Sequence, residues 1–401
     1  MEYVTLELKL ETPFLPGSVD PATPDPDWPL RPSEVKGLWR WWARALAAGV
    51  LFERGLLHGA GRRDVVKTPT REEAGCISQI VGLDMGLGYA GRREAQASCF
   101  RIRFEQINFA PPRDVSQNLA AQLQRVRLLT LGGRRLQYID KGSATLVVEE
   151  HVPCPLDGRA VEAALGALAL ALRLSCFGKG GRRGLGCFSV RARGRYSSLF
   201  TEEPKALIQR AVAAAGAVVD RAVSRCRGLR RGETSPCELP PMPALNTARR
   251  YDACIKDSAV LTPYMLVSVK RVDWRHLHNF FLRPTRTRVL HGDYSAQDVL
   301  RETLKAWILG LPREQKKTET GYRIIGGASR RASPLMLAIA SNAAYLSVFT
   351  SADWPRELEW RGGGRQRIAV AEADVLAAMA LALGEFLDYV KKLGGEAETW
   401  P

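Results

Sequence analysis

The segment CFGKGGRRGLGCFSV, residues 176–190, constrains the fold of this chain more than any other stretch. Five of its residues are glycine and three are cationic, and it lies between a long apolar run and a short alternating one. Glycine allows positive φ and lets a ligand approach the backbone without a Cβ in the way. We therefore expect a helix, then a loop that binds an anion, then a strand.

The cations of this loop do not fit a nucleotide-binding P-loop. A P-loop needs Ser or Thr after its lysine at the start of a helix, whereas here glycine follows the lysine and a strand follows the loop. A polyanion is the better interpretation, and a basic surface turn without a ligand is the alternative. The predicted contacts are Gly178, Lys179, Gly180, Gly181, Arg182, Arg183 and Gly184.

The charge of the chain favours a nucleic acid as the polyanion. The 401 residues carry a formal net charge of +16, and the 58 basic residues divide into 13 Lys and 45 Arg. Arginine binds phosphate through two hydrogen bonds and stacks on bases, and basic domains of this kind are typical of nucleic-acid binders. A GC-rich genome or a hot habitat would also raise the arginine content.

We expect a cytoplasmic protein without a metal or cofactor. No apolar run reaches the roughly 18 residues of a membrane span, and residues 1–10 alternate like a strand. Eight cysteines are scattered without the spacing of a zinc site, so we interpret them as small buried side chains in a reducing cytosol. Thermophile disulfides are the alternative, with Cys176–Cys187 and Cys226–Cys237 as the pairs to check.

The length and the order of elements predict two domains, at residues 1–230 and 231–401. In the first, strands are expected at 3–10, 98–105, 144–150 and 185–193, and helices at 33–49, with Ser33 as N-cap, 116–130, 161–174 and 203–226. The core order βαββαβ is that of a ferredoxin-like antiparallel sheet with two helices on one face. A linker at 228–245 leads to a strand at 261–270, a helix at 295–309, strands at 333–340 and 344–350 and a helix at 371–392. This second unit repeats the first without its last strand, so the predicted fold is α+β with two tandem ferredoxin-like domains.

The first predicted helix carries a basic stripe beside an apolar one. Lys36, Arg40 and Arg44 recur at i, i+4 and i+8, with Trp41 at the border and Trp42 on the apolar side. Because no acidic residue at i+4 balances the stripe, its cations repel one another unless an anion is bound. An ordinary solvated helix face is the alternative.

The motifs TPFLPG, RPSEVKGLWRWWARAL, GKGGRRGLG and GGASRRASPL resemble the RAMP superfamily of CRISPR proteins, most closely the first subunits of type III-B Cmr effector complexes. The helix motif of those subunits is matched by Arg31, Pro32, Ser33, Lys36, Gly37, Arg40, Trp41, Trp42 and Arg44, and their glycine-rich loop by Gly178 through Gly186. The stretch GGASRRASPL is similar to the first loop in composition and adds Arg330 and Arg331 as candidate RNA contacts.

The resemblance implies a non-catalytic RNA-binding subunit in an antiviral complex that cuts RNA complementary to its guide. Its partners would be crRNA near the 3′ end, target single-stranded RNA and other RAMP subunits. The candidate RNA contacts outside the glycine loop are Arg31, Lys36, Arg40, Trp41, Arg44, Arg330 and Arg331.

Two alternatives come from other function classes. A RAMP endoribonuclease that processes precursor crRNA often uses a histidine as general base, but none of the five histidines lies in either glycine-rich loop: His58, His151, His276, His278 and His291. The basic and aromatic region around the last three could contact RNA, and a metal site of His276, His278 and Asp293 is a weaker possibility. An assembly protein whose basic face meets an acidic neighbour is the other alternative.

Overall fold

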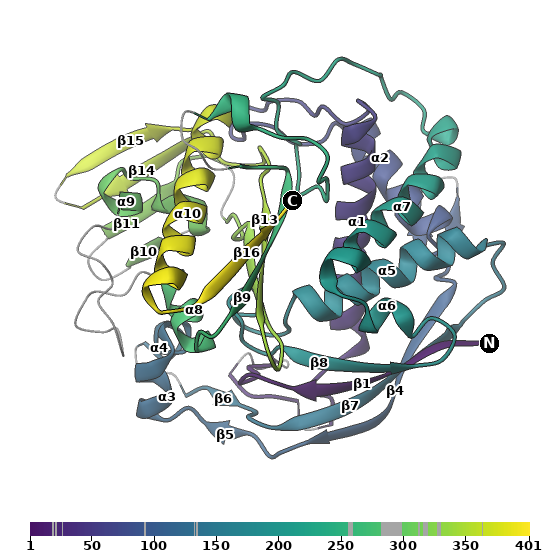
Figure 1. The fold of residues 1–401 in the computed structure, drawn as a ribbon, viewed down its shortest axis with the longest axis horizontal. Helices are drawn as coiled ribbons and strands as arrows, with labels where there is room; N and C mark the ends of the chain where they lie inside the picture. Colours follow the sequence, from purple (N-terminus) through teal and green to yellow (C-terminus); the bar gives the residue numbers. More distant parts are fainter. Residues whose placement is uncertain are drawn as a thin grey trace.

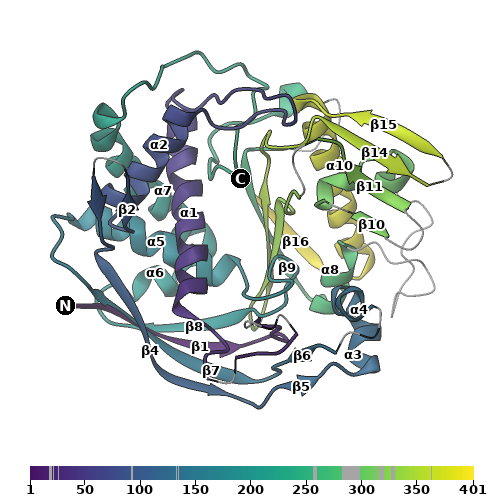
Figure 2. The ribbon, with the colours of Figure 1, turned by 180° about the vertical axis from the view of Figure 1, so that it is seen from behind.

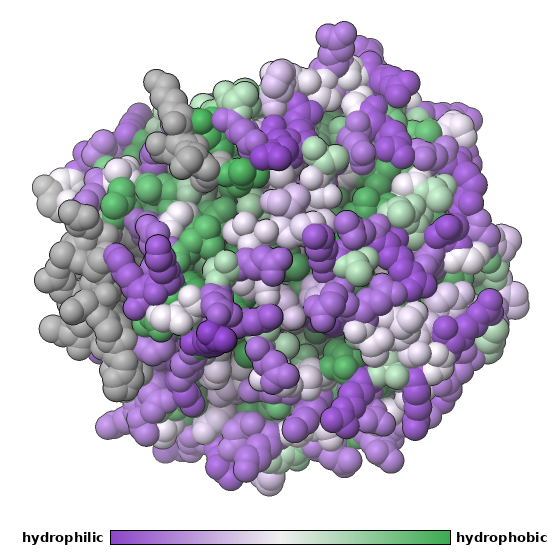
Figure 3. Space-filling model, in the orientation of Figure 1, coloured by the Kyte–Doolittle hydropathy of each residue, from purple (hydrophilic) through white to green (hydrophobic). Residues whose placement is uncertain are grey.

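The computed structural model describes the chain except for residues 18–19, 21, 26, 92–93, 132, 134, 256–259, 282–298, 312, 316–319, 327–329 and 363. Helices and antiparallel sheets make up a mixed fold, as the sequence predicts (Figure 1). The surface seen in Figure 3 is mainly hydrophilic, with apolar side chains in scattered groups.

The first sheet has four antiparallel strands in the order β4-β7-β1-β8. Its strands are β1 (Glu2–Leu10), β4 (Phe100–Phe109), β7 (Gly142–Glu150) and β8 (Phe188–Arg193). Along β1, Val4, Leu6 and Leu8 are buried whereas Glu7 and Lys9 are exposed, so one face of the sheet packs on the core. That face is covered by α1 (Pro32–Glu53) and α5 (Gly158–Leu174), and α7 (Pro204–Ala222) packs on both of these helices.

Helix α1 begins one residue before the predicted start, and Ser33 is not its N-cap. Arg31 occupies the N-cap position without a capping side-chain bond, and Pro32 follows at the first helical position. Proline suits that position because its missing N–H would have no partner within the helix and its φ is already helical.

Helix α5 is nearly all apolar because it is enclosed by other elements. Asp157 caps it by accepting a hydrogen bond from the backbone N–H of Ala160, at 2.8 Å. The helix packs between α1 and α7 and also contacts two strands of the second sheet. Neither α5 nor any other helix in the described part of the chain is long and apolar enough to cross a membrane.

The second sheet has the order β12-β13-β9-β16 and is also antiparallel. Its elements are β9 (Tyr264–Lys270), α8 (Trp274–Phe280), β12 (Leu335–Ile339), β13 (Ala344–Phe349), α10 (Glu372–Lys392) and β16 (Glu396–Trp400). The prediction that this unit lacks a last strand is wrong. Strand β16 is mostly exposed, so its sequence has no apolar alternation by which to recognise it.

Two predicted helices are interrupted. The described part of 295–309 contains only α9 (Val299–Glu302) and a 3₁₀ turn at Ala306–Leu309, and residues 295–298 lie outside the described residues. The helix expected at 116–130 is divided at Leu123 into α3 (Gln117–Gln122) and α4 (Gln124–Thr130). Smaller elements are α2 (Arg71–Gln79), a π-helical turn at Ile80–Asp84, β2 (Tyr89–Ala90), β3 (Ala95–Gln96), β5 (Arg113–Asp114), β6 (Gln137–Tyr138), α6 (Ser198–Thr201) and 3₁₀ turns at Val223–Arg225 and Asp252–Cys254.

A third four-stranded sheet, which the sequence did not predict, flanks the second unit. It has the order β10-β11-β14-β15 and consists of β10 (Arg313–Gln315), β11 (Thr320–Ile324), β14 (Glu357–Arg361) and β15 (Arg365–Ala369). Tyr322 and Leu358 bury one face of it in the core of the second unit. The sheet lies at the outer edge of the molecule, far from β1 and β8 (Figures 1 and 2).

The two larger sheets share a core at their junction. Phe349 and Tyr264 of the second sheet pack against Trp42 of α1, with ring centroids 5.6 and 6.3 Å away. Trp41 meets Phe349 edge-on at 5.1 Å, and Trp42 donates a hydrogen bond from Nε1 to Ser175 Oγ at 2.8 Å. The tryptophans of the first predicted helix therefore join the two units.

All eight cysteines form disulfides, so the expectation of free thiols in a reducing cytosol is wrong. The pairs are Cys76–Cys226, Cys99–Cys154, Cys176–Cys187 and Cys237–Cys254. The predicted pair Cys176–Cys187 is confirmed. The predicted pair Cys226–Cys237 is wrong because the fold brings Cys76 of α2 beside Cys226, 150 residues away in the chain.

These disulfides predict a protein that reducing agents destabilise. Replacing both Cys76 and Cys226 by Ala should lower the free energy of unfolding by about 2–5 kcal/mol, because the unfolded chain regains the freedom of a long loop. Denaturant unfolding under oxidising conditions measures the loss. The same comparison in excess dithiothreitol is the control, where the two proteins should differ much less. Eight titratable thiols in the untreated native protein would contradict the assignment.

Candidate nucleic-acid interface

The shape of the glycine-rich loop depends on its glycines. Positive φ occurs at Gly178, Gly180, Gly184 and Gly186, where other L residues are strained. Gly181 is required for a different reason, because a Cβ there would lie 2.3 Å from the carbonyl oxygen of Cys176. The Cys176–Cys187 disulfide closes the loop at its base.

One side of the loop is attached to the second unit through Arg183. The Arg183 guanidinium donates hydrogen bonds to the carbonyl oxygens of Leu335, at 3.5 Å, and Leu309. It also lies over the ring of Phe281, 4.5 Å from the centroid. Burial, with nearby arginines, holds its pKa well below the ordinary value. This side chain is therefore part of the junction between the units.

Arg182 faces the same junction. Its guanidinium donates to the carbonyl oxygen of Ser333 at 2.7 Å and lies over the ring of Trp41, 5.2 Å from the centroid. Burial lowers the pKa of Arg182 to about 10. The structure thus engages both half-buried loop arginines with protein groups, whereas the sequence pattern predicts them as phosphate contacts. Gly184 also faces inward, toward Leu337 of β12.

Arg331 of the second glycine-rich stretch is structural as well. It is 9% exposed, forms an ion pair with Asp353 at 2.9 Å and lies over the ring of Trp354, 4.8 Å from the centroid. The adjacent Arg330 is exposed. Of these two predicted RNA contacts, Arg331 therefore lies in the interior and Arg330 lies on the surface.

His278 supports the loop from beneath, and both of its ring nitrogens contact the backbone. Its Nδ1 lies 2.7 Å from the carbonyl oxygen of Arg183, and its Nε2 accepts the backbone N–H of Arg125 at 3.2 Å. Burial lowers the pKa of His278 to about 4, so the ring is neutral and Nδ1–H donates. Asp293 and His291 lie outside the described residues. No group of three or more His, Cys, Asp or Glu within the described ranges is placed to hold a metal ion.

The three cations of the basic stripe of α1 differ in exposure and in their contacts. Arg40 donates from Nε to the carbonyl oxygen of Leu87 at 3.0 Å, so its guanidinium binds the protein's own backbone. Lys36 is half-buried, and burial together with Arg40 lowers its pKa. Arg44 is exposed, whereas Trp41 belongs to the junction described above. Of the stripe, only Arg44 is fully open to solvent.

Four cations from separate parts of the chain surround a hollow on the outer side of the loop. The hollow has a volume of about 610 Å³ and is lined by Gly17, Arg31, Ser33, Glu34, Arg125, Gly178, Lys179, Gly180 and Arg330. Arg31 belongs to the N-terminal segment, Lys179 to the loop, Arg125 to α4 and Arg330 to the second unit. The loop, the α3–α4 segment and both units thus meet at one basic site.

The electrostatics of the hollow favour an anion. Burial, followed by the repulsion of Arg330, lowers the pKa of Arg125, and burial also lowers the pKa of Lys179. Partly desolvated like charges are costly without a counter-charge, and a bound anion would relieve that cost. Sequence reasoning missed Arg125 because it stands in an ordinary helical pattern and only the fold brings it to the loop.

Glu34 is the single carboxylate of the hollow, and it holds the loop in place. Its Oε1 accepts the backbone N–H of Gly178 at 2.9 Å. Burial raises the pKa of Glu34, and the hydrogen bond from Gly178 and the charge of Arg31 oppose that rise. The first turn of α1 is thereby fixed to the glycine loop.

Comparison with known proteins identifies the family of the N-terminal part of the chain. Residues 7–189 match the model of the RAMP superfamily. The match includes the end of β1, all of α1, the glycine loop and the start of β8, and it confirms the resemblance to this superfamily that the sequence motifs indicate. No curated protein sequence matches the chain.

Three solved structures are similar in fold. One is Cmr1 from Pyrococcus furiosus in its apo form, with 17% identity, a TM-score of 0.46 and 92% of each chain covered. The second is a chain of the type III-B Cmr-beta complex bound to cognate target RNA and AMPPnP in the presence of single-stranded DNA. It has 12% identity and a TM-score of 0.49, and the likeness covers 96% of this chain and 99% of that chain. The third is a chain of Cmr-beta bound to cognate target RNA, with 12% identity, a TM-score of 0.50, and 95% and 100% covered. At this identity the last likeness shows a shared fold.

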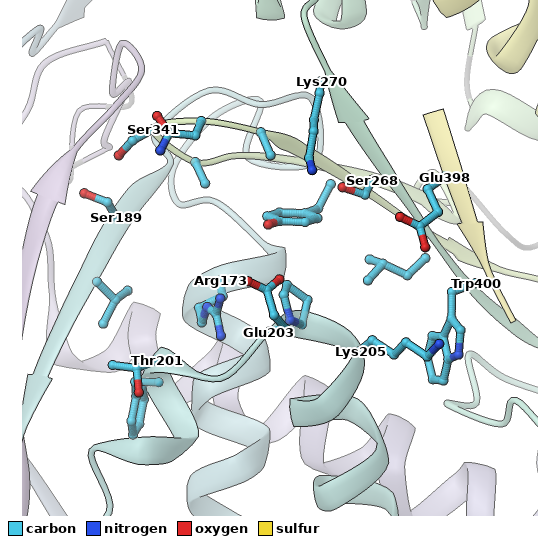
Figure 4. Close-up of a pocket in the computed structure, with 18 of the residues that line it drawn as sticks. Arg173, Ser189, Thr201, Glu203, Lys205, Ser268, Lys270, Ser341, Glu398 and Trp400 are labelled. Carbon is cyan, nitrogen blue, oxygen red and sulfur yellow. The ribbon is translucent and has the colours of Figure 1, made fainter. Parts of the chain in front are cut away.

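A second, larger hollow in the structure is less suited to a polyanion. It measures about 720 Å³ and lies between β8, the α6–α7 segment and the second sheet (Figure 4). Its cations, Arg173, Lys205 and Lys270, are interspersed with the carboxylates of Glu203 and Glu398. Lys205 also lies 5.9 Å from the ring centroid of Trp400. The glycine-loop hollow, with four cations and one hydrogen-bonded carboxylate, is therefore the stronger candidate for an RNA site.

The buried contacts of Arg183 predict a structural role. Arg183→Met should lower the free energy of unfolding by about 2–6 kcal/mol, because two carbonyl oxygens lose their donor at about 1–3 kcal/mol each. Arg44→Met, at an exposed position of α1, is the matched control and should change stability by less than about 0.5 kcal/mol. Urea unfolding measures both. Equal stability of the two variants would show that Arg183 does not hold the units together.

Proposed function

We propose that this chain is a non-catalytic RNA-binding subunit of a type III-B CRISPR effector complex. Its RNA site is the hollow beside the glycine loop, where it contacts crRNA near the 3′ end, target RNA, or both. The observation that carries the proposal is the convergence of Arg31, Arg125, Lys179 and Arg330 on one glycine-lined surface. Other RAMP subunits of the complex are its protein partners.

The architecture proposed for this function is a tandem of ferredoxin-like domains, at residues 1–230 and 231–401. Both larger sheets run βαββαβ along the chain when the smaller elements are set aside, and in both the strands are ordered second, third, first, fourth. This is the arrangement of a ferredoxin-like unit. The RAMP match of residues 7–189 supports the first domain, and the shared fold with a Cmr-beta chain supports the pair.

The surface chemistry supports recognition of RNA by its backbone. The exposed positions of β1 and β8 in the first sheet are all charged, namely Glu2, Glu7, Lys9, Arg191 and Arg193. These strands therefore do not offer the exposed aromatic rings on which RRM sheets stack bases. The hollow supplies guanidinium groups, an ammonium and the Ser33 hydroxyl instead, which are suited to phosphate and ribose oxygens.

The hollow is also poorly equipped to cut RNA. Its lining contains no histidine, and its one carboxylate, Glu34, accepts a hydrogen bond from Gly178. A general base must reach the 2′-hydroxyl that it deprotonates, and Glu34 is already used to hold the loop. We therefore propose binding without cleavage and do not favour the endoribonuclease. Defined fragments from end-labelled RNA, abolished by one substitution in the hollow, would reverse that choice.

The RNA site is tested by neutralising two of the cations that line the hollow. Lys179→Gln combined with Arg330→Gln should weaken binding of labelled single-stranded RNA and reduce the slope of log affinity against log salt by about 1.4, since each phosphate contact contributes roughly 0.7. Lys391→Gln combined with Lys392→Gln, at exposed positions near the end of α10, changes the net charge equally and serves as control. Slopes that fall equally in both variants would reject the hollow as the site. Absence of RNA binding by the unaltered chain would reject the proposed function itself.

A further inference from the structure

The third sheet carries most of its charged side chains on one face. Arg361 pairs with Arg365 across β14 and β15, and Glu359 lies between Arg367 on β15 and Arg323 on β11. Side chains of directly paired residues point to the same side of a sheet, and residues two apart share that side. We call the set Arg323, Arg361, Arg365 and Arg367 the arginine face.

The opposite face fixes which way the arginine face points. Leu358 and Tyr322 are buried in the core of the second unit, and Ile368 and Trp360 pack against it. The rings of Tyr322 and Trp360 lie 4.8 Å apart. Because alternate residues of a strand point to opposite sides, burial of this apolar face turns the arginines outward at the edge of the molecule (Figures 1 and 2).

The positive charge of this face is only partly neutralised. Arg361 lies 2.5 Å from Glu359, and that hydrogen bond, with the charges of Arg361, Arg365 and Arg323, lowers the pKa of the Glu359 carboxyl. Arg323, Arg365 and Arg367 are exposed and form no ion pair with another described residue. The register also holds two further acidic residues, Glu357 of β14 and Glu314 of β10, which pairs with Gly321. Four arginines thus share the face with three acidic residues.

We propose that the arginine face is a second contact surface for RNA, which binds the phosphate backbone of a strand held at the glycine-loop hollow. The proposal rests on the proposed RNA-binding function. All four cations are arginines, whose planar guanidinium binds phosphate through paired hydrogen bonds. Arg365 and Arg367 are two residues apart, a separation of about 7 Å along a strand, which is comparable to the distance between successive phosphates of a nucleic-acid strand.

The composition of the face favours RNA over an acidic protein. Stable protein interfaces have a desolvated centre of aromatic and apolar side chains. The arginine face offers no such centre, because the other residues in its register are Glu314, Gly321, Glu357, Glu359 and Ala369. A phosphate backbone needs no apolar centre, since charge and hydrogen bonds supply most of its affinity.

The chain connection places this face within reach of the first RNA site. Arg330 lines the glycine-loop hollow, and Gly326 follows the end of β11. Six residues of chain separate Ile324, the last residue of β11, from Arg330, and six residues span at most about 22 Å, so the end of β11 lies within that distance of Arg330. One RNA strand can therefore contact both surfaces.

The experiment neutralises this face and a matched strand elsewhere in the full-length chain. Arg365→Gln combined with Arg367→Gln is compared with Arg191→Gln combined with Arg193→Gln, two exposed arginines with the same spacing on β8. Binding of a long labelled oligouridylate is measured across a salt series. We expect the slope of log affinity against log salt to fall by about 1.4 in the β15 variant and to change much less in the β8 variant. A hexanucleotide, which fills the hollow alone, should bind the β15 variant and the unaltered chain equally.

Each result separates this inference from the proposed function. In one outcome, the β15 variant binds the long RNA with unchanged slope and affinity while the Lys179→Gln, Arg330→Gln variant binds it more weakly. That result would reject the arginine face as an RNA contact and would keep the hollow as the RNA site. An acidic protein partner would then be the remaining occupant of that face. Equal losses in the β15 and β8 variants would also overturn it, because they would reflect net charge alone. If the unaltered chain binds no RNA, the proposed function fails first.

Discussion

The contacts of the half-buried loop arginines with the second unit are the interactions on which the rest of the site depends. Arg182 and Arg183 donate to the carbonyl oxygens of Ser333, Leu335 and Leu309, and their guanidinium groups lie over Trp41 and Phe281. A buried charge is tolerated only when such partners replace water. These contacts attach the loop to the second sheet, next to the tryptophans that join the two cores.

This attachment gives the glycine loop two different sides. On the inner side, two arginines, the disulfide Cys176–Cys187 and the neutral ring of His278 make the junction rigid. On the outer side, Lys179 is presented beside Arg125 and Arg330, which lie far away in the sequence. The proposed RNA site therefore requires both units in place, and a change at the junction would disturb RNA binding without touching the hollow.

Much of the fold could be predicted because apolar periodicity marks buried elements. The strands of the first sheet, α1, α5 and α10 all have a buried face, and the sequence located each within a few residues. Strand β16 and the arginine-bearing strands β11, β14 and β15 are exposed on at least one side and escaped prediction. The candidate site was predicted in part: Arg31, Lys179 and Arg330 line the hollow, whereas Arg125 was missed.

The sequence by itself determined that a glycine-rich loop with cations follows a buried helix, and that the chain resembles the RAMP superfamily. It did so because glycine content, charge and apolar period are local properties. Only the tertiary structure decided which cations contact the second unit. Arg182, Arg183 and Arg331 are as basic in the sequence as Lys179 and Arg330, but the second unit supplies carbonyl oxygens, aromatic rings and the Asp353 carboxylate that bury them. Those partners lie at least 20 residues away in the chain, and up to about 150, so no local pattern could have named them.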